Sequence, residues 1–267
     1  LISLFGALLL KNAGLLPPWE LTYLFTCDEE TGSQSGQKVY EREARDADLA
    51  LVFEGGRERD GQPCFVTSRL GVILGAIGVE GREAHADKAY LEGRSAVLEL
   101  AHQIIRLYSF NDYEKGIYYN VAPISGGRPN GVVAGEARGE FCVAGIPENA
   151  DFPVIQAKLD SLARQVTVEG CRVRVAYRTL FPAMEQNAAN HSAYLRAAEA
   201  AELLGWAPAE IAAPAATDAA YLSTCGVPTA DALSAMAEQI HTTEERVSIP
   251  SIRDRTALCA VLLGLLE

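Results

Sequence analysis

Apolar residues recur with helical spacing at both ends of the chain. In the first segment, the apolar positions share one helical face: Leu1, Leu4, Leu8 and Leu9. Gly14 follows and would end this helix, because glycine favours the left-handed conformation found just after a helix. Residues 251–267 are also apolar at helical spacing and predict a second helix that covers a sheet.

Two short apolar runs with a polar run between them follow the first helix. Residues 19–26 (WELTYLFT) predict a buried strand, residues 36–46 an exposed helix, and residues 49–56 (LALVFEGG) a second strand. A strand, a helix and a strand at this spacing predict a parallel crossover unit. The sequence therefore favours an α/β domain with a mostly parallel sheet.

Acidic residues lie where these two strands end. Glu29 and Glu30 follow the first strand, and Glu54 ends the second. Ligands of parallel sheets gather at the carboxyl ends of the strands, so these carboxylates are candidates for a common site. A structural role stays open, because acidic residues after a strand also suit the N-terminus of the next helix.

Residues 67–178 show a different order of elements. The expected elements are a strand over 71–79, a helix over 91–109, two strands within 116–145, a helix over 152–166 and a strand over 171–178. The apolar residues of the helix over 91–109 share one side: Val97, Ala101, Ile104, Ile105 and Tyr108. This β-α-β-β-α-β order is ferredoxin-like. It predicts a compact module at 67–178, inserted into a domain made of 1–66 and 179–267, which resumes with a helix over 190–206.

Composition narrows the function classes. The chain has 267 residues, of which 49% are hydrophobic and 22% charged, as in ordinary globular proteins. Its net charge of −12 argues against a nucleic-acid partner, which needs clustered Lys and Arg. We expect no membrane span, because no apolar run reaches roughly 18–20 residues. Six cysteines without a C-x-x-C spacing predict reduced thiols and a cytoplasmic protein.

Five blocks in order along the chain carry a family resemblance. They are LFTCDEETGS, LALVFEGG, VEGREAHA, ISGGRPNGVVAGEA, and TDAAYLSTCGVPTADAL followed by IHTTEERVSIPSI. Together they resemble the zinc-aminopeptidase-fold family of glutamate carboxypeptidase, aminoacylase, acetylornithine deacetylase and succinyl-diaminopimelate desuccinylase. The resemblance covers essentially the whole chain. It implies a zinc-aminopeptidase-like catalytic domain with an inserted ferredoxin-like lid and dimerisation domain.

The resemblance implies roles for four residues of the catalytic domain. Glu29 would be the general base, and Glu30, Glu54 and His241 would bind zinc. Carboxylate and imidazole are suitable zinc ligands, and a complete site would hold two Zn²⁺ ions, with Co²⁺ or Mn²⁺ as alternatives. From residue type alone, His241 is as well explained as a solvated loop residue, and Glu54 as the cap of its strand.

Further roles are implied by the other blocks. His85 would reach the partner subunit's active site and stabilise the oxyanion, while Asn130, Thr217 and Asp218 would contact substrate. The polar surroundings of His85 also fit an exposed turn residue, and the Arg-Pro-Asn-Gly setting of Asn130 also fits a turn.

Some family features are missing from the chain. There is no His-x-Asp motif, since neither His102 nor His191 fits it, and both are interpreted as structural. The bridging Asp of an Asp-x-Lys-Gly block is absent as well, so we expect the chain to be the C-terminal part of a longer enzyme. Ala144 replaces an expected substrate-binding Arg, and Ala215–Ala216 replace a Gly-Gly pair.

The sequence thus predicts zinc-dependent hydrolysis of an amide bond in N-acyl amino acids or small peptides. The alternative is a non-catalytic fragment or pseudoenzyme that dimerises through the lid domain. The expected assembly is a homodimer, in which the apolar strand over 71–79 is a sheet edge that a symmetric partner covers.

Overall fold

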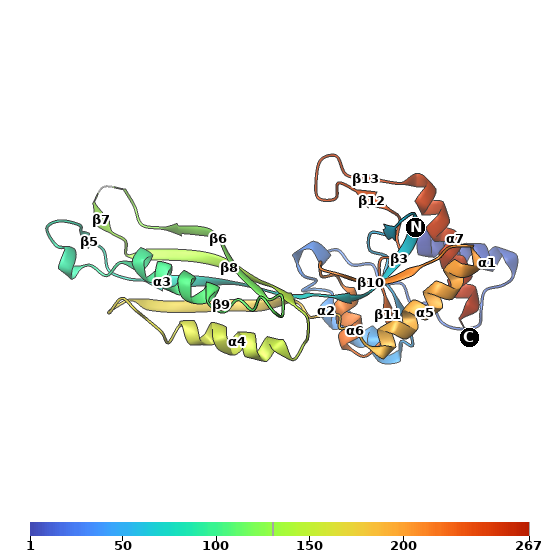
Figure 1. Ribbon diagram of the computed structural model, residues 1–267, viewed down its shortest axis with the longest axis horizontal. Coiled ribbons are helices and arrows are strands. Elements are labelled where there is room, and N and C mark those ends of the chain that lie inside the picture. The colour runs from blue at the N-terminus through green and yellow to red at the C-terminus, as the bar shows by residue number, and fades with distance from the viewer. Residues whose placement is uncertain (130, 267) are drawn as a thin grey trace. The chain divides into compact units, whose positions relative to one another are not determined.

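The computed structural model describes residues 1–129 and 131–266. The chain forms two compact units, which we call the first unit (Leu1–Arg69 and Met184–Glu267) and the inserted unit (Leu70–Ala183) (Figure 1). The boundaries expected at residues 67 and 178 would cut through two strands that this division leaves whole. None of the helices in the described ranges is long and apolar enough to cross a membrane.

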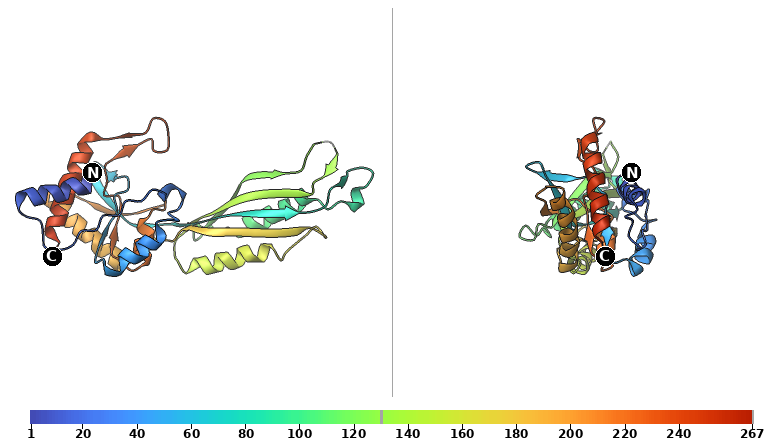
Figure 2. Two further views of the ribbon diagram at one scale, coloured as in Figure 1. Left: turned by 180° about the vertical axis from the view of Figure 1, so that it is seen from behind. Right: turned by 90° about the vertical axis from the view of Figure 1, so that its right-hand side faces the viewer.

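Helices form much of the first unit (Figure 2). They are α1 (Ile2–Ala13), η1 (Glu29–Thr31), α2 (Gln37–Glu43), η2 (Ala44–Asp46), α5 (Ala188–Leu203), α6 (Ala219–Thr224) and α7 (Ile249–Leu265). Small residues let α5 lie close to the strands. Ala197, Ala200 and Ala201 of this helix share a buried core with Phe65 and with Leu258 of α7.

The first helix ends where the sequence predicted, but a different face is buried. Gly14 has a φ of 70°, and its N–H bonds to the carbonyls of the last turn of α1. Ile2, Gly6 and Leu10 are buried, and a Cβ on Gly6 would lie 3.0 Å from the Cβ of Cys259 in α7. The predicted apolar face is the exposed one: Leu1, Leu4, Leu8 and Leu9.

Most strands of the first unit have two or three residues, whereas one strand has eight and another has five. They are β1 (Ala50–Leu51), β2 (Arg57–Arg59), β3 (Gln62–Arg69), β10 (Ala209–Ala213), β11 (Thr229–Ala230), β12 (Ala237–Glu238) and β13 (Arg246–Val247). β1 pairs with β11 and β10 with β3 in parallel, whereas β2–β3 and β12–β13 are antiparallel. The unit therefore combines parallel and antiparallel pairing.

The strand predicted over residues 19–26 is not formed. The segment is extended, but no strand within residues 1–129 and 131–266 pairs with it. Phe25 is 78% exposed and stacks on Tyr23, at 6.3 Å between ring centroids. Apolar composition favours a strand, yet a strand needs a neighbour for its backbone groups, and the sequence pattern does not show which segment that would be.

The inserted unit has the β-α-β-β-α-β order. Its elements are β4 (Gly71–Glu80), β5 (Ala84–His85), η3 (Tyr90–Glu92), α3 (Ala96–Tyr108), β6 (Tyr118–Gly126), β7 (Val132–Val133), β8 (Glu136–Ile146), α4 (Asp151–Leu162) and β9 (Arg172–Phe181). The main sheet is antiparallel with the strand order β6-β8-β4-β9. β4 is thus a central strand, and the expectation that residues 71–79 form a sheet edge is wrong.

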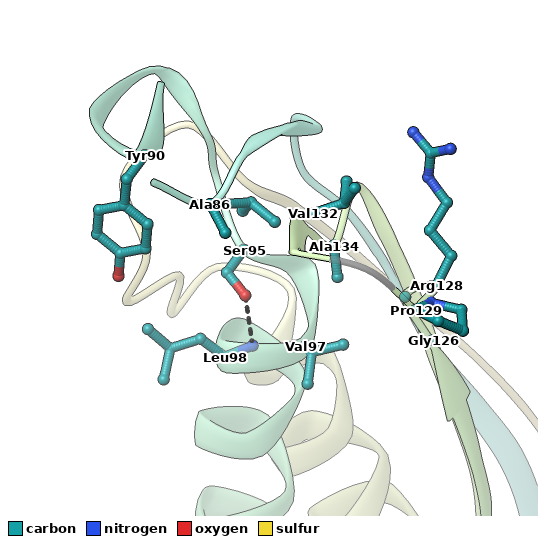
Figure 3. A pocket seen from close by; sticks show the side chains of 12 residues that line it. Ala86, Tyr90, Ser95, Val97, Leu98, Gly126, Arg128, Pro129, Val132 and Ala134 are labelled. Carbon is teal, nitrogen blue, oxygen red and sulfur yellow. Dashed lines mark hydrogen bonds between the residues drawn. The ribbon is translucent and has the colours of Figure 1, made fainter. Parts of the chain in front are cut away.

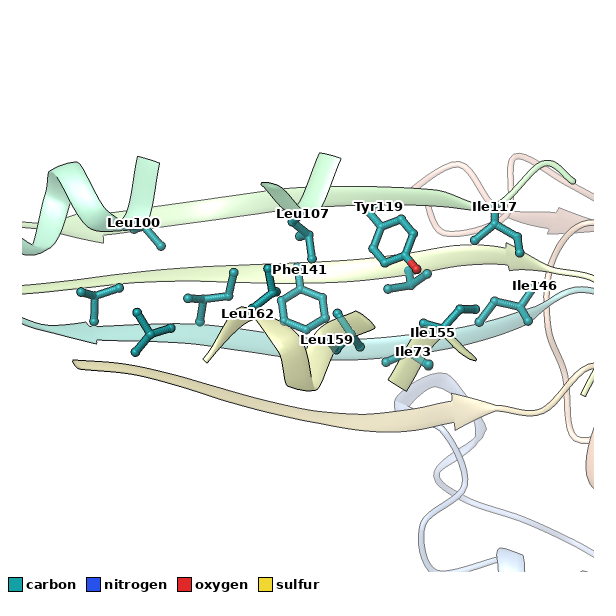
Figure 4. Packing of buried hydrophobic residues seen from close by; sticks show 14 of the residues in the cluster. Ile73, Leu100, Leu107, Ile117, Tyr119, Phe141, Ile146, Ile155, Leu159 and Leu162 are labelled. Atoms are coloured by element: carbon teal, nitrogen blue, oxygen red, sulfur yellow. The ribbon is translucent and has the colours of Figure 1, made fainter. Parts of the chain in front are cut away.

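The helix α3 begins at Ser95, whose hydroxyl accepts a hydrogen bond from the Leu98 N–H at 3.2 Å (Figure 3). Its buried face includes Leu100 and Leu107, which pack with Phe141 and other residues of the sheet and of α4 (Figure 4). Most of the apolar side that the sequence singled out lies away from this core, although Ile104 packs against it. Three members of this side are 39–70% exposed: Val97, Ile105 and Tyr108.

Candidate active site

A tight turn presents the two adjacent carboxylates, Glu29 and Glu30. They open the short helix η1, which Gly32 ends at a φ of 91°. The carbonyl of Asp28 accepts hydrogen bonds from the N–H groups of Thr31 at 3.1 Å and Ser33 at 2.9 Å. We call residues 26–33 the acidic turn. Its backbone bonds fix the direction in which the two carboxylates leave the chain.

Several acidic groups act on Glu29. Burial raises the pKa of Glu29, and the charges of Glu54, Asp218 and Glu30 raise it further, to about 7, although Arg69 opposes the shift. Carboxylates from separate parts of the chain therefore lie within each other's electric field. A carboxyl group with a pKa near neutral pH is suited to accept and return a proton in a reaction.

Glu54 and Asp231 stand at the ends of two paired strands. Glu54 follows β1 and Asp231 follows β11, and because these strands are parallel both carboxylates lie at the same edge. Burial and the charge of Asp231 raise the pKa of Glu54. The sequence analysis missed Asp231, because it predicted no strand before this residue, whereas it placed Glu54 at the end of a predicted strand.

A buried ion pair accompanies these carboxylates. Arg69 Nε lies 2.6 Å from Asp231 Oδ2, and the two side chains are 2% and 0% exposed. Arg69 Nη1 also donates to the Ala215 carbonyl at 2.8 Å, and the Thr217 hydroxyl donates to Asp231 Oδ2 at 2.8 Å. Each charge is paired and hydrogen-bonded, as buried charges require.

Thr217 and Asp218, predicted to contact substrate, are buried, with 4% and 8% of their surface exposed. Asp218 accepts hydrogen bonds from the hydroxyls of Ser33 and Tyr40, and from Thr26 Oγ1 at 3.1 Å. Substrate contact by Thr217 and Asp218 stays a prediction. Tyr40 and Ser33 carry no sequence signal of their own, because their importance depends on a contact with a residue almost 200 positions away.

The predicted metal ligands are not assembled into a site. His241 is exposed in the loop between β12 and β13, with a φ of 64°, and its N–H donates to Glu245 Oε2 at 3.2 Å. Within residues 1–129 and 131–266, no three His, Cys, Asp or Glu side chains are placed to hold a metal ion. The carboxylates around Glu29 and Glu54 are chemically suitable for a cation, but too few donors converge to complete a site.

The remaining histidines have other surroundings. His85, in β5, is exposed, and its Nδ1 lies against a carboxylate oxygen of Asp87. His191 Nδ1 lies 2.7 Å from Glu210 Oε2 and its ring stacks on Tyr194, in keeping with the structural role expected for it. His102 is half-buried on α3.

A hollow of about 620 Å³ lies in the inserted unit, between the start of α3 and the segment after β6 (Figure 3). Its lining includes Gly127, Arg128 and Pro129, and none of the described residues that line it is acidic. The predicted substrate contact Asn130 lies outside the described residues. The hollow is formed by residues of the inserted unit alone.

Comparison with known proteins identifies the family. Residues 1–264 match the family described as "Peptidase family M20/M25/M40". The chain belongs to this family. The M20 resemblance drawn from the sequence blocks is thus confirmed. Carboxypeptidase G2 from Pseudomonas sp. (strain RS-16) is 26% identical over 260 residues, which are 96% of this chain, and the chain spans 61% of that protein's length.

Solved structures show the same α/β fold. Aminopeptidase PepT from Bacillus cereus has a TM-score of 0.77 at 22% identity, covering 98% of this chain and 68% of that one. The M20 family metallo-carboxypeptidase Sso-CP2 from Sulfolobus solfataricus also has a TM-score of 0.77, at 15% identity, covering 99% and 74%. The Bacillus subtilis YXEP protein, described as a dinuclear metal binding peptidase, has a TM-score of 0.72 at 14% identity, covering 99% and 70%.

Proposed function

We propose that the protein containing this chain is a metal-dependent hydrolase that cleaves amide bonds in N-acyl amino acids or small peptides. Family membership supports this, and so do the peptidase names of its relatives. The observation that carries the proposal is the acidic turn, which presents Glu29 and Glu30 side by side and brings Glu29 within the electric field of Glu54. Because the chain spans 61% of carboxypeptidase G2, the activity is proposed for the whole protein.

Glu29 is the proposed proton carrier. Amide hydrolysis requires a water molecule to lose a proton as it attacks the carbonyl carbon, and the leaving amine to gain one. A carboxylate placed next to the attacking water can accept the first proton and give it to the amine. Adjacent carboxylates then have separate tasks, with Glu29 moving protons and Glu30 facing the metal.

Zinc is the proposed metal, with two ions in a complete site and Co²⁺ or Mn²⁺ as substitutes. Glu30 and Glu54 supply oxygen donors, and His241 supplies an imidazole. An ion held by these residues would polarise the scissile carbonyl and lower the pKa of water. The three residues do not converge in the described chain, so the proposal requires the His241 loop to approach the carboxylates and further donors to complete the site.

The roles of the two neighbouring carboxylates are tested by Glu29→Gln and Glu30→Gln in the complete enzyme. Glu29→Gln should reduce turnover of an N-acyl amino acid at least ~100-fold and leave the zinc content unchanged, because it removes the proton carrier and keeps the shape. Glu30→Gln should lose zinc together with activity. Glu41→Gln, on the exposed face of α2, is the matched control and should change neither. Loss of zinc from Glu29→Gln would show that the two roles are reversed.

The inserted unit is the proposed dimerisation domain. Its edge strand β6 and the neighbouring helix α3 expose apolar side chains, which we call the α3–β6 surface: Val97, Ile105, Tyr108 and Ile124. A second copy of the chain would cover both the apolar groups and the free edge of the sheet. His85 and Asn130 are the residues that this assembly would bring to the partner's substrate.

A non-catalytic protein that dimerises through the inserted unit is the second candidate. The observation that favours it is the lack of three converging metal donors within the described ranges. The two candidates differ in a hydrolysis assay of the complete protein with added Zn²⁺. For the compartment we propose the cytoplasm, since the six cysteines are unpaired in the structure.

A further inference from the structure

The Asp218 carboxylate accepts hydrogen bonds from hydroxyl groups at both ends of the acidic turn. Thr26 precedes Glu29 by three residues and donates to Asp218 Oδ2, and Ser33 follows Glu30 by three residues and donates to Oδ1. The carboxylate therefore bridges the two ends of the segment that presents Glu29 and Glu30.

Two tyrosines, Tyr40 and Tyr221, also hold the acidic turn. The Tyr40 hydroxyl, from α2, donates to Asp218 Oδ2. The ring of Tyr40 stacks on Tyr221 of α6 with 5.6 Å between centroids, and the Tyr221 hydroxyl donates to the Gly32 carbonyl at 3.0 Å. α2 and α6 are thus joined to each other and to the last residues of the turn.

Thr217, the residue before Asp218, contacts the carboxylate of Asp231. The Thr217 hydroxyl donates to Asp231, which lies at the same sheet edge as Glu54 and is held by Arg69. Two consecutive residues therefore connect the acidic turn to the strand ends that carry Glu54. Their spacing is fixed by the backbone, so they set the distance between the two groups of carboxylates.

We propose that Asp218 is a positioning residue, which fixes the acidic turn relative to Glu54 and does not contact substrate. Its two oxygens are already occupied by three hydroxyl donors, and its side chain is buried. A substrate group that displaced any of these donors would leave a buried hydroxyl without its partner, at a cost of about 1–3 kcal/mol. The catalytic part of the inference rests on the proposed function, whereas the structural part does not.

The state of Tyr40 supports this arrangement. Burial raises the pKa of Tyr40, and its hydrogen bond to Asp218 raises it further. The phenol therefore stays protonated and continues to donate to the carboxylate across the neutral range. A carboxylate that accepts hydrogen bonds from three hydroxyl groups is held in one orientation. A residue that positions other residues needs such a fixed orientation.

Amide hydrogen exchange of the 267-residue chain, followed by mass spectrometry, tests the structural part. In Asp218→Asn, exchange in peptides covering residues 24–36 should rise about tenfold, while peptides from α5 and α7 stay unchanged. Glu210→Gln is the matched control, because Glu210 also accepts from several side chains of the first unit. It should produce no selective rise at residues 24–36.

A second variant tests the same contact in case Asp218→Asn does not fold. Tyr40→Phe removes one donor and keeps the ring stack, so it should raise exchange at residues 24–36 by a smaller factor. Unchanged exchange there in both variants, or an equal rise throughout the first unit, would overturn the positioning role.

Kinetics of the complete enzyme test the catalytic part. Asp218→Asn should lower kcat at least ~10-fold with KM changed less than ~2-fold, since the carboxylates move but substrate contacts remain. A rise in KM at constant kcat would instead show a substrate contact and refute the proposal. If the complete protein has no hydrolase activity, the proposed function fails, while the exchange result still decides whether Asp218 holds the turn.

Discussion

Arg69 and Asp231 lie 162 positions apart in the chain and form a buried ion pair, with 2.6 Å between Nε and Oδ2. Arg69 is the last residue of the first unit before the inserted unit, and its backbone exchanges hydrogen bonds with Met184, where the chain returns. The same guanidinium opposes the rise in pKa of Glu29 and Glu54. A single side chain thus contributes to the closure of the first unit and to the charge balance of the candidate site.

Removal of one partner of this ion pair should therefore lower the stability of the protein. Arg69→Met should lower the free energy of unfolding by about 3–5 kcal/mol, because Asp231 is left as an uncompensated buried charge. The double variant Arg69→Met with Asp231→Leu should recover most of this loss. Urea unfolding of the two variants measures the difference. A double variant no more stable than the single one would show that the ion pair itself, and not the orphaned charge, determines the stability.

Glu210 makes stability depend on pH. Burial alone would raise its pKa, but hydrogen bonds from Thr67, Gln186 and His191 outweigh burial and lower it below the usual value. A carboxyl with a lowered pKa in the folded state stabilises the protein above its unfolded pKa, and this contribution disappears as the pH falls through the folded pKa.

We expect Glu210→Gln to be less stable than the unchanged chain at pH 7 by about 1–2 kcal/mol. The two proteins should approach equal stability near pH 3. Thermal unfolding between pH 3 and 7 measures this trend. Glu199→Gln, an exposed carboxylate on α5, is the control and should show no such convergence. A constant difference at every pH would rule out the ionised state of Glu210 as its origin.

Metal binding by the 267-residue chain should be weak. Its described residues bring no three donors together, and catalytic zinc sites use at least three protein ligands. Isothermal titration with Zn²⁺ should give a dissociation constant above ~10 μM, weakened further by Glu54→Gln. Two tight sites per chain would contradict this expectation and would require a large movement of the His241 loop.

Local patterns in the sequence predicted several elements well. The stop of α1 at Gly14 and the positions of α3, α4, α5 and α7 follow from periodicity and turn chemistry, which act within a few residues. The hairpin of β2 and β3 was missed, although Asp60-Gly61, with φ angles of 53° and 72°, is a recognisable turn signal. Asp231 was missed because no strand was predicted before it.

Features that depend on distant partners could not be predicted in the same way. Periodicity showed that α1 and α3 each have apolar faces, but not which face meets the core. Strand order in the inserted unit is also non-local, and β4 is central because β8 and β9 pair with its two edges. Pro123 in β6 was an available signal, since proline within a strand is typical of an edge. The contacts between Asp218 and the acidic turn could not be predicted from sequence patterns, because they join distant parts of the chain.

The exposed α3–β6 surface leads to a prediction about assembly. Tyr108 on α3 donates to Asn120 Oδ1 at 3.0 Å and accepts from the Val121 N–H at 3.2 Å, so the helix and the edge strand form one continuous surface. Ile105 is 70% exposed on α3 and Ile124 is 59% exposed on β6. Two-fold pairing through this surface would bury both residues and extend the sheet across the dimer.

Ile105→Lys and Ile124→Lys should therefore each convert the complete protein from a dimer to a monomer. A lysine at either position would place two like charges near the two-fold axis and remove apolar burial. Val154→Lys is the matched control, because Val154 is 56% exposed on α4 of the same unit and lies outside the α3–β6 surface. Light scattering with size-exclusion chromatography measures the mass of each variant. If the unchanged protein is a monomer, or if Val154→Lys dissociates it as effectively as Ile105→Lys, then the α3–β6 surface is not the dimer interface.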